Sequence, residues 1–297
     1  AQLDIDVGLA GELGFGLRVE RRTTDYTDSA GLQLDPSETM LGGEVRYSHS
    51  FDDGLVAFVS LSRGYKAGGF NLGPVPDGGR EFLEESLWNV EAGLKTLWVD
   101  DTLQFNGSVF YSRRRDQQVR TSVQLNPNDP ASFIFYTANA AEGDTVGLEA
   151  ELRWLPSEAW ELWSSIGILD AEFKSVADAA GSLAGRDQAH APNYTIAAGG
   201  AYQHHSGLFA RLDASARDEF YFDVSHDQRS QRQEIVNARI GFAAERWTAQ
   251  VWLRNVFDER YAVRGFYFGN EPPDFSNTLY VRQGDPRQLG VTFDMRF

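Results

Sequence analysis

Apolar and polar residues alternate with a period of two along most of this chain. The final stretch, Arg287–Phe297, has polar residues at most even positions and apolar residues at its odd ones: Leu289, Val291, Phe293, Met295 and Phe297. Successive side chains of a β-strand point to opposite faces, so the pattern predicts a strand with one apolar and one polar face. A β-sheet that separates lipid from water has one apolar and one polar face of this kind.

The alternation recurs in about thirteen stretches of roughly ten residues, about twice the common strand length of soluble proteins. About ten tilted residues are enough for a strand to cross a bilayer. The clearest stretches cover residues 2–9, 12–21, 102–114, 145–154, 207–217, 237–244 and 247–257. We therefore expect an all-β fold, an antiparallel up-and-down transmembrane β-barrel with about 13 strands present.

Short and long connections between these stretches alternate along the chain. The short ones lie at 10–11, 52–54, 100–101, 156–158, 205–206 and near Glu245; the long ones lie at about 26–38, 66–85, 125–131, 175–190, 224–230 and 258–285. In an up-and-down sheet every second connection lies at the same rim. One rim with tight turns and one with long loops is typical of outer-membrane barrels, whereas a β-sandwich has no reason to sort its loops.

Five aromatic residues lie within about two residues of a short turn: Phe51, Trp98, Trp154, Trp160 and Trp247. On the apolar face of their strands they would form an aromatic girdle at one membrane–water interface. The alternative is that they are core aromatics of a soluble β-protein. Their shared position along the strands favours the girdle.

Composition narrows the classes of protein. The 297 residues include no cysteine, which removes disulfides and thiolate metal sites, and the net charge of −16 argues against nucleic acid as a partner. No apolar run approaches the ~20 residues of a membrane helix, so any membrane crossing must use strands. The chain begins with Ala1 and has no signal segment, so we expect it to be processed or cut from a longer one.

Several segments resemble signatures of the TonB-dependent outer-membrane receptors. They are Leu61–Asn71 (LSRGYKAGGFN), Arg254–Tyr261 (RNVFDERY), Gly284–Arg287 (GDPR) and the terminal Phe297, with weaker matches at Val146–Glu149 and His190–Pro192. The resemblance spans nearly the whole chain in the same order.

The resemblance implies a plugged 22-stranded barrel in the outer membrane of a Gram-negative bacterium. It also implies energised import of a bulky nutrient, often a ferric siderophore. Thirteen strands would be the tenth to the twenty-second, so residues 1–297 are expected to form a single barrel domain, the carboxy-terminal portion, without the plug. An odd count points to a piece, since single-chain bacterial barrels have even counts. The TonB energy-coupling complex would then act only through a missing amino-terminal segment.

Within this plan, the polar strand positions would line the inside of the barrel: Gln104, Asn106, Glu149, Glu151, Arg153, Arg211, Asp213 and Arg217. Candidate ligand-binding residues follow Tyr261 in the last long loop: Arg264, Phe266, Tyr267 and Phe268. A basic residue beside aromatic rings suits an anionic, ring-bearing ligand. The alternative is that these residues pack the loop or form an outer girdle.

The remaining partners follow from the same plan. Outer-membrane lipid would cover the apolar face, and Arg113–Arg115 could pair with lipopolysaccharide phosphates or an anionic substrate, or be a solvated charge run. Lys66–Gly69 is expected to be structural, because glycines allow a sharp entry into the loop.

Catalytic and metal-binding signals are absent from the sequence. No nucleophile elbow or paired-acid arrangement is found, and on a strand the adjacent His204 and His205 would point to opposite faces. We expect no enzyme activity, no metal and no cofactor. Two alternatives to the receptor stay open: a plugless porin or autotransporter-type barrel, and a soluble secreted β-protein that acts as an adhesin. The identity of the substrate also stays open.

Overall fold

The computed structural model describes residues 1–296 apart from residues 30, 53, 77, 127, 128, 130, 131, 179, 180, 183, 225, 270 and 277. Phe297, the predicted carboxy-terminal signature, therefore lies outside the described residues. All regular elements in the described part are strands. No helix there has the length and apolar character needed to cross a membrane.

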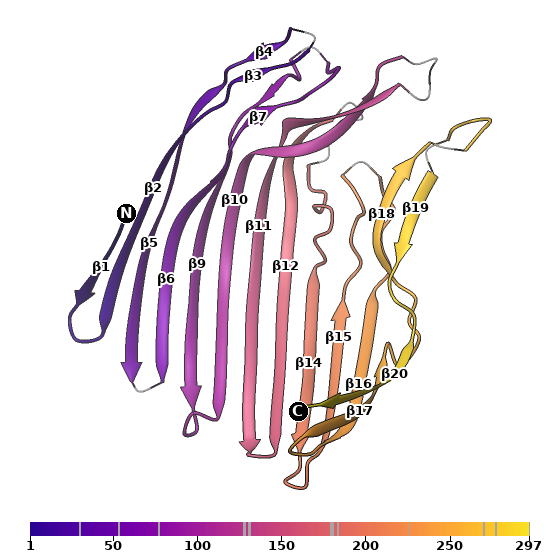
Figure 1. Cartoon of the computed structure of the whole chain (residues 1–297). Coiled ribbons are helices and arrows are strands. Elements are labelled where there is room, and N and C mark those ends of the chain that lie inside the picture. The colour runs from indigo at the N-terminus through magenta and orange to yellow at the C-terminus, as the bar shows by residue number, and fades with distance from the viewer. Residues whose placement is uncertain are drawn as a thin grey trace.

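Thirteen long strands form one antiparallel sheet in which each strand pairs with its neighbours along the chain (Figure 1). This confirms the predicted up-and-down topology and strand number. The strands are β1 (Gln2–Val7), β2 (Gly11–Thr23), β5 (Ser37–Asp52), β6 (Leu55–Lys66), β9 (Glu85–Trp98), β10 (Leu103–Gln124), β11 (Phe133–Ser157), β12 (Trp160–Asp178), β14 (Tyr194–Gln203), β15 (Leu208–Arg217), β16 (Gln233–Ala243), β17 (Trp247–Arg254) and β20 (Gln288–Met295).

Tight turns and long loops lie at opposite rims, as predicted. The lower rim in Figure 1 carries the turns, and the upper rim carries loops with short strands of their own. These are β3 (Tyr26–Thr27) with β4 (Gln33–Leu34), β7 (Gly69–Phe70) with β8 (Glu81–Phe82), β13 (Gly181–Ser182) against β12, and β18 (Ala262–Phe268) with β19 (Thr278–Gln283). The loop after Tyr261 is thus a β-hairpin.

Two strands are much longer than the sequence pattern predicts. β10 has 22 residues and β11 has 25, so Arg113 lies within a strand and not at its loop end. The register between them shifts between Arg114 and Gln117, and Asp116 has a positive φ of 54°. Such a bulge inserts extra residues into one strand, which breaks the period-two alternation and hides the continuing strand.

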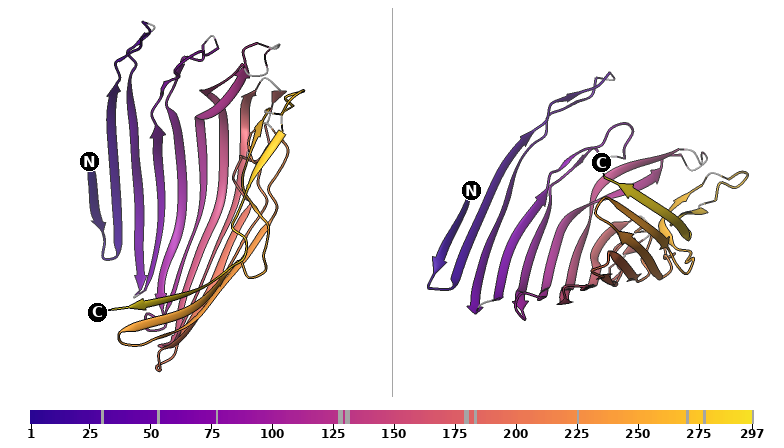
Figure 2. Two further views of the ribbon diagram at one scale, coloured as in Figure 1. Left: turned by 45° about the vertical axis from the view of Figure 1, so that its right-hand side comes forward. Right: turned by 60° about the horizontal axis from the view of Figure 1, so that its bottom comes forward.

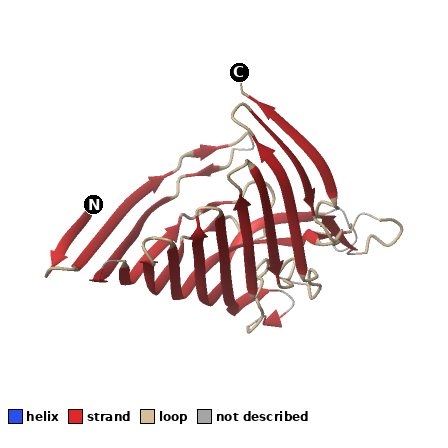
Figure 3. Ribbon diagram, turned by 90° about the horizontal axis from the view of Figure 1, so that it is seen from below, coloured by secondary structure: helices blue, strands red, loops and turns tan. Residues whose placement is uncertain are grey.

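The sheet curves into an open trough (Figures 2 and 3). β1 and β20 form its two edges, and no pairing between them occurs among the described strands, so the barrel is not closed. The convex face carries the apolar side chains. Val291 is 75% exposed and Leu208 43% exposed, and no second layer covers this face in the described part of the chain.

The concave face is polar with mixed charge. Register places on it every residue predicted to line the barrel: Gln104, Asn106, Glu149, Glu151, Arg153, Arg211, Asp213 and Arg217. Aromatic rings on this face lie over glycines that are their direct cross-strand partners: Phe58 over Gly93, Phe110 over Gly147, Trp163 over Gly199, Phe209 over Gly241 and Trp252 over Gly290. Each ring covers the backbone of its partner glycine, which has no side chain of its own to shield it from solvent.

The five predicted girdle aromatics all lie near the rim of tight turns and are 37–56% exposed: Phe51, Trp98, Trp154, Trp160 and Trp247. Trp98 and Trp154 are both direct partners of Leu103, so the three side chains share the convex face. Trp160 packs against Tyr202 at 4.8 Å, and Trp247 stacks on Phe293 at 6.0 Å. Their membrane role stays a prediction.

Candidate ligand site at the loop rim

Three upper-rim loops contact one another around a small apolar centre. They are residues 184–193, residues 218–232 between β15 and β16, and the hairpin β18–β19. Phe220 and Phe222 of the middle loop are 4% and 5% exposed. A Cβ at Gly265 of β18 would lie 2.6 Å from Cγ of Phe222, so the hairpin backbone packs directly on that ring.

Charged side chains join the first two loops around Tyr221. The guanidinium groups of Arg186 and Arg229 lie 3.9 and 4.0 Å from the ring centroid of Tyr221. Arg186 also donates to Asp227 at 2.6 Å, and Arg229 donates to Glu219 at 3.1 Å. Because both cations are paired with carboxylates, this arrangement holds the loops together and does not leave an open anion site.

Tyr267 fixes the hairpin to the middle loop. Its ring stacks on His226 with centroids 3.5 Å apart and an interplanar angle of 9°, and its hydroxyl donates to Gln228. Burial raises the pKa of Tyr267, so the phenol stays protonated and keeps this donor. His226 in turn contacts Asp223 at 2.7 Å.

The structure separates the four predicted ligand residues onto two faces of β18. Gly265 and Tyr267 face the middle loop. Arg264, Phe266 and Phe268 alternate with them and lie on the other face, with the two phenylalanines 52% and 45% exposed. Phe266 stacks on Tyr280 of β19 at 5.6 Å. This second face therefore presents two cations, Arg264 and its direct partner Arg282, beside stacked, accessible rings.

The charge of Arg264 affects His190, a residue of the first of the three loops. His190 packs against Phe220 with ring centroids 5.0 Å apart. Burial lowers the pKa of His190, and the nearby charges of Arg264 and then Arg217 lower it further. The positive charge of Arg264 therefore acts at His190, although carboxylates such as Asp223 lie in the same cluster and act in the opposite sense.

Side-chain amides hold the other loops together, and the alternation pattern of the sequence does not predict these contacts. The side chain of Asn71 donates to the backbone carbonyl of Thr137 and accepts from its backbone amide, both at 2.8 Å. The side chain thus pairs with β11 as a strand backbone would, between residues 66 positions apart in the sequence. Asn139 makes the same paired contact with Leu83, at 2.9 and 2.6 Å. Asn71 belongs to the family-like segment Leu61–Asn71. This motif is the sequence feature that could have pointed to the contact.

The second family-like segment fixes the base of the β18–β19 hairpin. Asn255 is 4% exposed and donates to the carbonyls of Glu259 and Asp285 at 2.9 and 3.1 Å, while its side-chain oxygen accepts from the Glu259 amide. Asp258 accepts from the backbone amide of Arg287 at 2.9 Å. The likeness to family signatures therefore corresponds to loop anchoring.

The glycines of Lys66–Gly69 are also structural. A Cβ at Gly68 would lie 2.5 Å from the carbonyl oxygen of Phe82, and a Cβ at Gly69 would lie 2.7 Å from the ring of that residue. His204 and His205 lie at the tight turn expected there, but their ring centroids are only 3.8 Å apart, so the rings do not point to opposite faces. Among the described residues, no group of three or more His, Cys, Asp or Glu side chains is arranged to hold a metal ion.

Comparison with known proteins identifies the family. The sequence model described as TonB dependent receptor-like, beta-barrel matches residues 1–256. The chain belongs to this family. Its members are transport receptors and not enzymes, in agreement with the sequence-based expectation.

The pesticin receptor of Yersinia pestis is 24% identical over 274 residues, which cover 87% of this chain and 38% of that receptor. The ferric yersiniabactin uptake receptor FyuA from Yersinia pestis has a similar fold, with a TM-score of 0.80 and 20% identity over 100% of this chain and 44% of its own. The siderophore receptor PiuA from Acinetobacter baumannii gives a TM-score of 0.73 and 16% identity, over 98% and 41%. The chain thus spans less than half the length of these proteins.

Proposed function

We propose that this chain is a single barrel domain, the carboxy-terminal wall of an outer-membrane receptor for the energised uptake of a bulky small molecule. The observation that carries the proposal is the uncovered apolar face of the sheet opposite a polar concave face, in a member of a receptor family. Only hydrocarbon could cover so many exposed apolar side chains without a second protein layer. Outer-membrane lipid and lipopolysaccharide are therefore its proposed surroundings, in a Gram-negative bacterium.

The proposed substrate is a ferric siderophore. The relatives include a ferric yersiniabactin receptor and a siderophore receptor. In this chain, Arg264 beside the exposed rings of Phe266 and Phe268 offers a cation and aromatic surface to an anionic, ring-bearing chelate. Tyr267 supports this surface from behind by fixing the hairpin.

The proposed energy source is the TonB complex, acting through a plug and an amino-terminal segment that this sequence does not include. Transport by these residues alone would leave open sheet edges in lipid, where each unsatisfied backbone group costs several kcal/mol. The wall is therefore proposed to act together with the rest of the barrel.

An uptake assay tests the proposal. The whole reading frame would be expressed in a Gram-negative host deleted for its own siderophore receptors, and ⁵⁵Fe accumulation would be measured with a panel of siderophores. We expect uptake of at least one ferric siderophore in a host with TonB and none in its tonB deletion. Uptake independent of TonB would indicate a passive pore. Correct insertion without uptake of any ferric siderophore would reject the proposed substrate.

Replacement of Arg264 by Gln tests the binding surface. We expect weaker binding of the transported chelate, by about tenfold for one lost charge-assisted contact. Arg246, an exposed arginine in the tight turn between β16 and β17 at the opposite rim, provides the control Arg246→Gln. Equal effects of the two substitutions would argue against a specific role for Arg264.

A further inference from the structure

The concave face carries two arginines directly opposite each other. Arg211 of β15 and Arg239 of β16 are partners in register, and Trp252 of β17 is the partner of Arg239 on its other side. Arg254 lies on the same face two residues nearer the loop rim, with its guanidinium 5.0 Å from the ring centroid of Trp252. Three guanidinium groups therefore lie on three neighbouring strands, and Arg211, Arg239 and Arg254 are called the arginine cluster below.

The cluster has more positive than negative charge. Arg211 donates from two nitrogens to Asp213 on its own strand, at 2.9 and 2.8 Å. Within the described part of the chain, neither Arg239 nor Arg254 forms an ion pair or a side-chain hydrogen bond. The strands on both sides of β16 are described. Asp213 is the one acidic residue among the concave positions that surround Arg239, which also include Phe209, Arg211, Asn237, Gly241, Gln250, Trp252 and Arg254.

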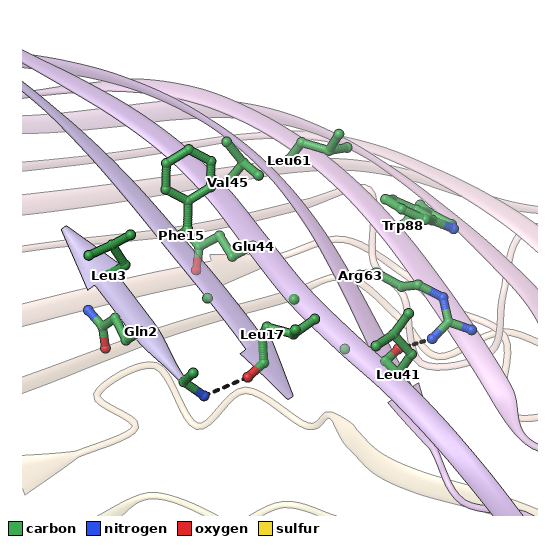
Figure 4. Close-up of a pocket in the computed structure, with 14 residues that line it drawn as sticks. Gln2, Leu3, Phe15, Leu17, Leu41, Glu44, Val45, Leu61, Arg63 and Trp88 are labelled. Atoms are coloured by element: carbon green, nitrogen blue, oxygen red, sulfur yellow. Dashed lines mark hydrogen bonds between the residues drawn. The ribbon is translucent and has the colours of Figure 1, made fainter. Parts of the chain in front are cut away.

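Other arginines of the sheet have their charge compensated by neighbouring groups. On the convex face, for example, Arg63 donates to the carbonyl of Leu41 (Figure 4) and to the carboxylate of Glu84. Like charges on directly opposite residues destabilise an antiparallel strand pair. The pairing of Arg211 with Arg239 therefore lowers stability without a full set of carboxylates to offset it. A local conflict of this kind is expected where residues serve function.

Aromatic rings contact two of the three guanidinium groups. Arg211 lies 4.1 Å from the ring centroid of Trp163, as Arg254 lies over Trp252. Stacking on a ring covers one face of a guanidinium and leaves the N–H groups at its edge able to donate. Asp213 occupies part of the edge of Arg211, whereas no carboxylate of the described residues occupies that of Arg254. The cluster therefore has donors left for an anion.

The cluster begins at the base of the hairpin that carries Arg264. Arg254 immediately precedes Asn255, the residue that fixes this base. Nearer the rim on β15, Arg217 donates to the carbonyl of Ala262, the first residue of β18, at 3.5 Å. Cationic side chains on the concave face thus continue from the candidate ligand surface toward the turn rim.

We propose that the arginine cluster is a second anion-binding site, which a transported chelate occupies after it leaves the loop rim and before it passes the turn rim. The ligand is an anionic chelate with carboxylate groups, because a carboxylate matches the paired N–H donors of a guanidinium. The inference rests on the proposed function and adds to it a site inside the barrel. Successive weak sites suit conduction, since a bound ion must also leave.

Uptake kinetics separate this site from the loop rim. The receptor would be produced from its whole reading frame in the host without siderophore receptors, with the ferric siderophore that the wild type imports. We expect R239Q/R254Q to lower the maximal rate of uptake about tenfold. The Kd measured on cells that lack TonB should not change, because without energy the chelate stays at the rim. An unchanged maximal rate would overturn the proposal.

Arg46 provides the matched control. It also lies on the concave face, on β5, but it is paired with Glu12 at 3.1 Å. R46Q is expected to keep both the maximal rate and the Kd of the wild type. An equal loss of rate in R46Q and R239Q/R254Q would overturn a specific role of the cluster.

A second double variant separates charge from structure. R239K/R254K keeps both charges, so we expect it to recover most of the maximal rate, with equal amounts of inserted receptor in all variants. A rate as low as that of R239Q/R254Q would overturn the proposal. Entry of vancomycin would be measured in the same cells. If R239Q/R254Q lets this large antibiotic enter, the arginines hold the rest of the receptor in place and the proposal is wrong.

Chemical labelling tests the site without transport. Phenylglyoxal modifies accessible arginines, and peptide mass spectrometry reports each position in the purified whole receptor. We expect citrate, a tricarboxylate, to slow the labelling of Arg239 and Arg254 but not of Arg46, and the uncharged triethyl citrate to have no effect. Protection without citrate would mean that protein carboxylates occupy the cluster, which would overturn the proposal.

The labelling result also distinguishes this inference from the proposed function. A wild type that imports a ferric siderophore but shows no protection by citrate would reject the second site alone. A wild type that shows the protection but imports no ferric siderophore would reject the proposed function and support the anion site.

Discussion

Trp88 and Trp98 lie on the same face of β9, ten residues apart. At about 3.3 Å per residue the separation is about 33 Å along the strand, and a strand tilt of about 40° reduces it to a height of about 25 Å. This height equals that of the apolar band of outer-membrane barrels. Trp98 stands at the turn rim beside Trp154, and Trp88 is the direct partner of Arg63 on β6 and of Arg113 on β10. The two tryptophans therefore delimit the expected membrane thickness.

A charge placed between these two levels should be costly on the convex face alone. Val109 is 52% exposed on that face and pairs with Ala92, which lies near the middle of the interval. We expect Val109→Arg to lower the free energy of unfolding in phospholipid vesicles by about 2–4 kcal/mol. Urea titration followed by tryptophan fluorescence would measure the change.

The adjacent residue provides the control for this substitution. Ser108 lies on the concave face, so Ser108→Arg should change the free energy of unfolding by less than about 1 kcal/mol. If the two arginines cost the same, the convex face does not contact lipid.

The number and order of the strands, and the face of the sheet on which each side chain lies, were predictable. Period-two alternation is a local signal that each strand carries by itself. The full lengths of β10 and β11 were not predictable, since the bulge near Asp116 shifts the alternation. The rim contacts were also hidden. Asn71 and Thr137 are 66 residues apart, and a contact between a loop and the end of a distant strand produces no periodic pattern in the sequence. Arg264 and Phe266 were selected as candidates from residue type, and their ligand role stays a prediction. Their separation from Tyr267 required the register of the hairpin.

Glycine positions under aromatic rings should tolerate no side chain. A Cβ at Gly199 would lie 2.1 Å from Cζ2 of Trp163 and 2.7 Å from the carbonyl oxygen of Leu212. We expect Gly199→Ala to destabilise the sheet by about 1–3 kcal/mol through overpacking. Gly64 of β6 has no atom within 4 Å of a Cβ, so Gly64→Ala is the matched control and should be neutral or slightly stabilising. Unfolding in detergent would compare them, and equal stabilities would contradict the ring contact.

Removal of the Asn255 amide should release the base of the β18–β19 hairpin. Asn255→Ala leaves the backbone partners at Glu259 and Asp285 without their donor in a buried place. We expect a loss of about 2–3 kcal/mol and faster protease cleavage between residues 256 and 287. Asn255→Asp should be no better, because a carboxylate cannot donate to the two carbonyls. The exposed Gln104 provides the control Gln104→Ala, and an unchanged cleavage rate in N255A would contradict the anchoring role.

Protonation of His190 should weaken the loop rim. Burial and the charge of Arg264 lower the pKa of His190 in the folded protein, so the unfolded chain, with a histidine pKa near 6.5, takes up the proton first as the pH falls. The stability contributed by neutral His190 is therefore complete above about pH 6.5. It decreases as the pH falls toward the lower pKa of the folded state.

Histidine NMR titration can measure this pKa directly, with His190→Gln used to assign the signal. We expect Arg264→Gln to raise the pKa of His190, because one of the charges that lowers it is removed. A bound anionic ligand at Arg264 should raise it as well, for the same reason. Arg282→Gln removes a charge from the paired strand and should leave the pKa of His190 nearly unchanged. If Arg264→Gln has no larger effect than Arg282→Gln, the charge of Arg264 does not reach His190, and an anion held there would not be detected through this histidine.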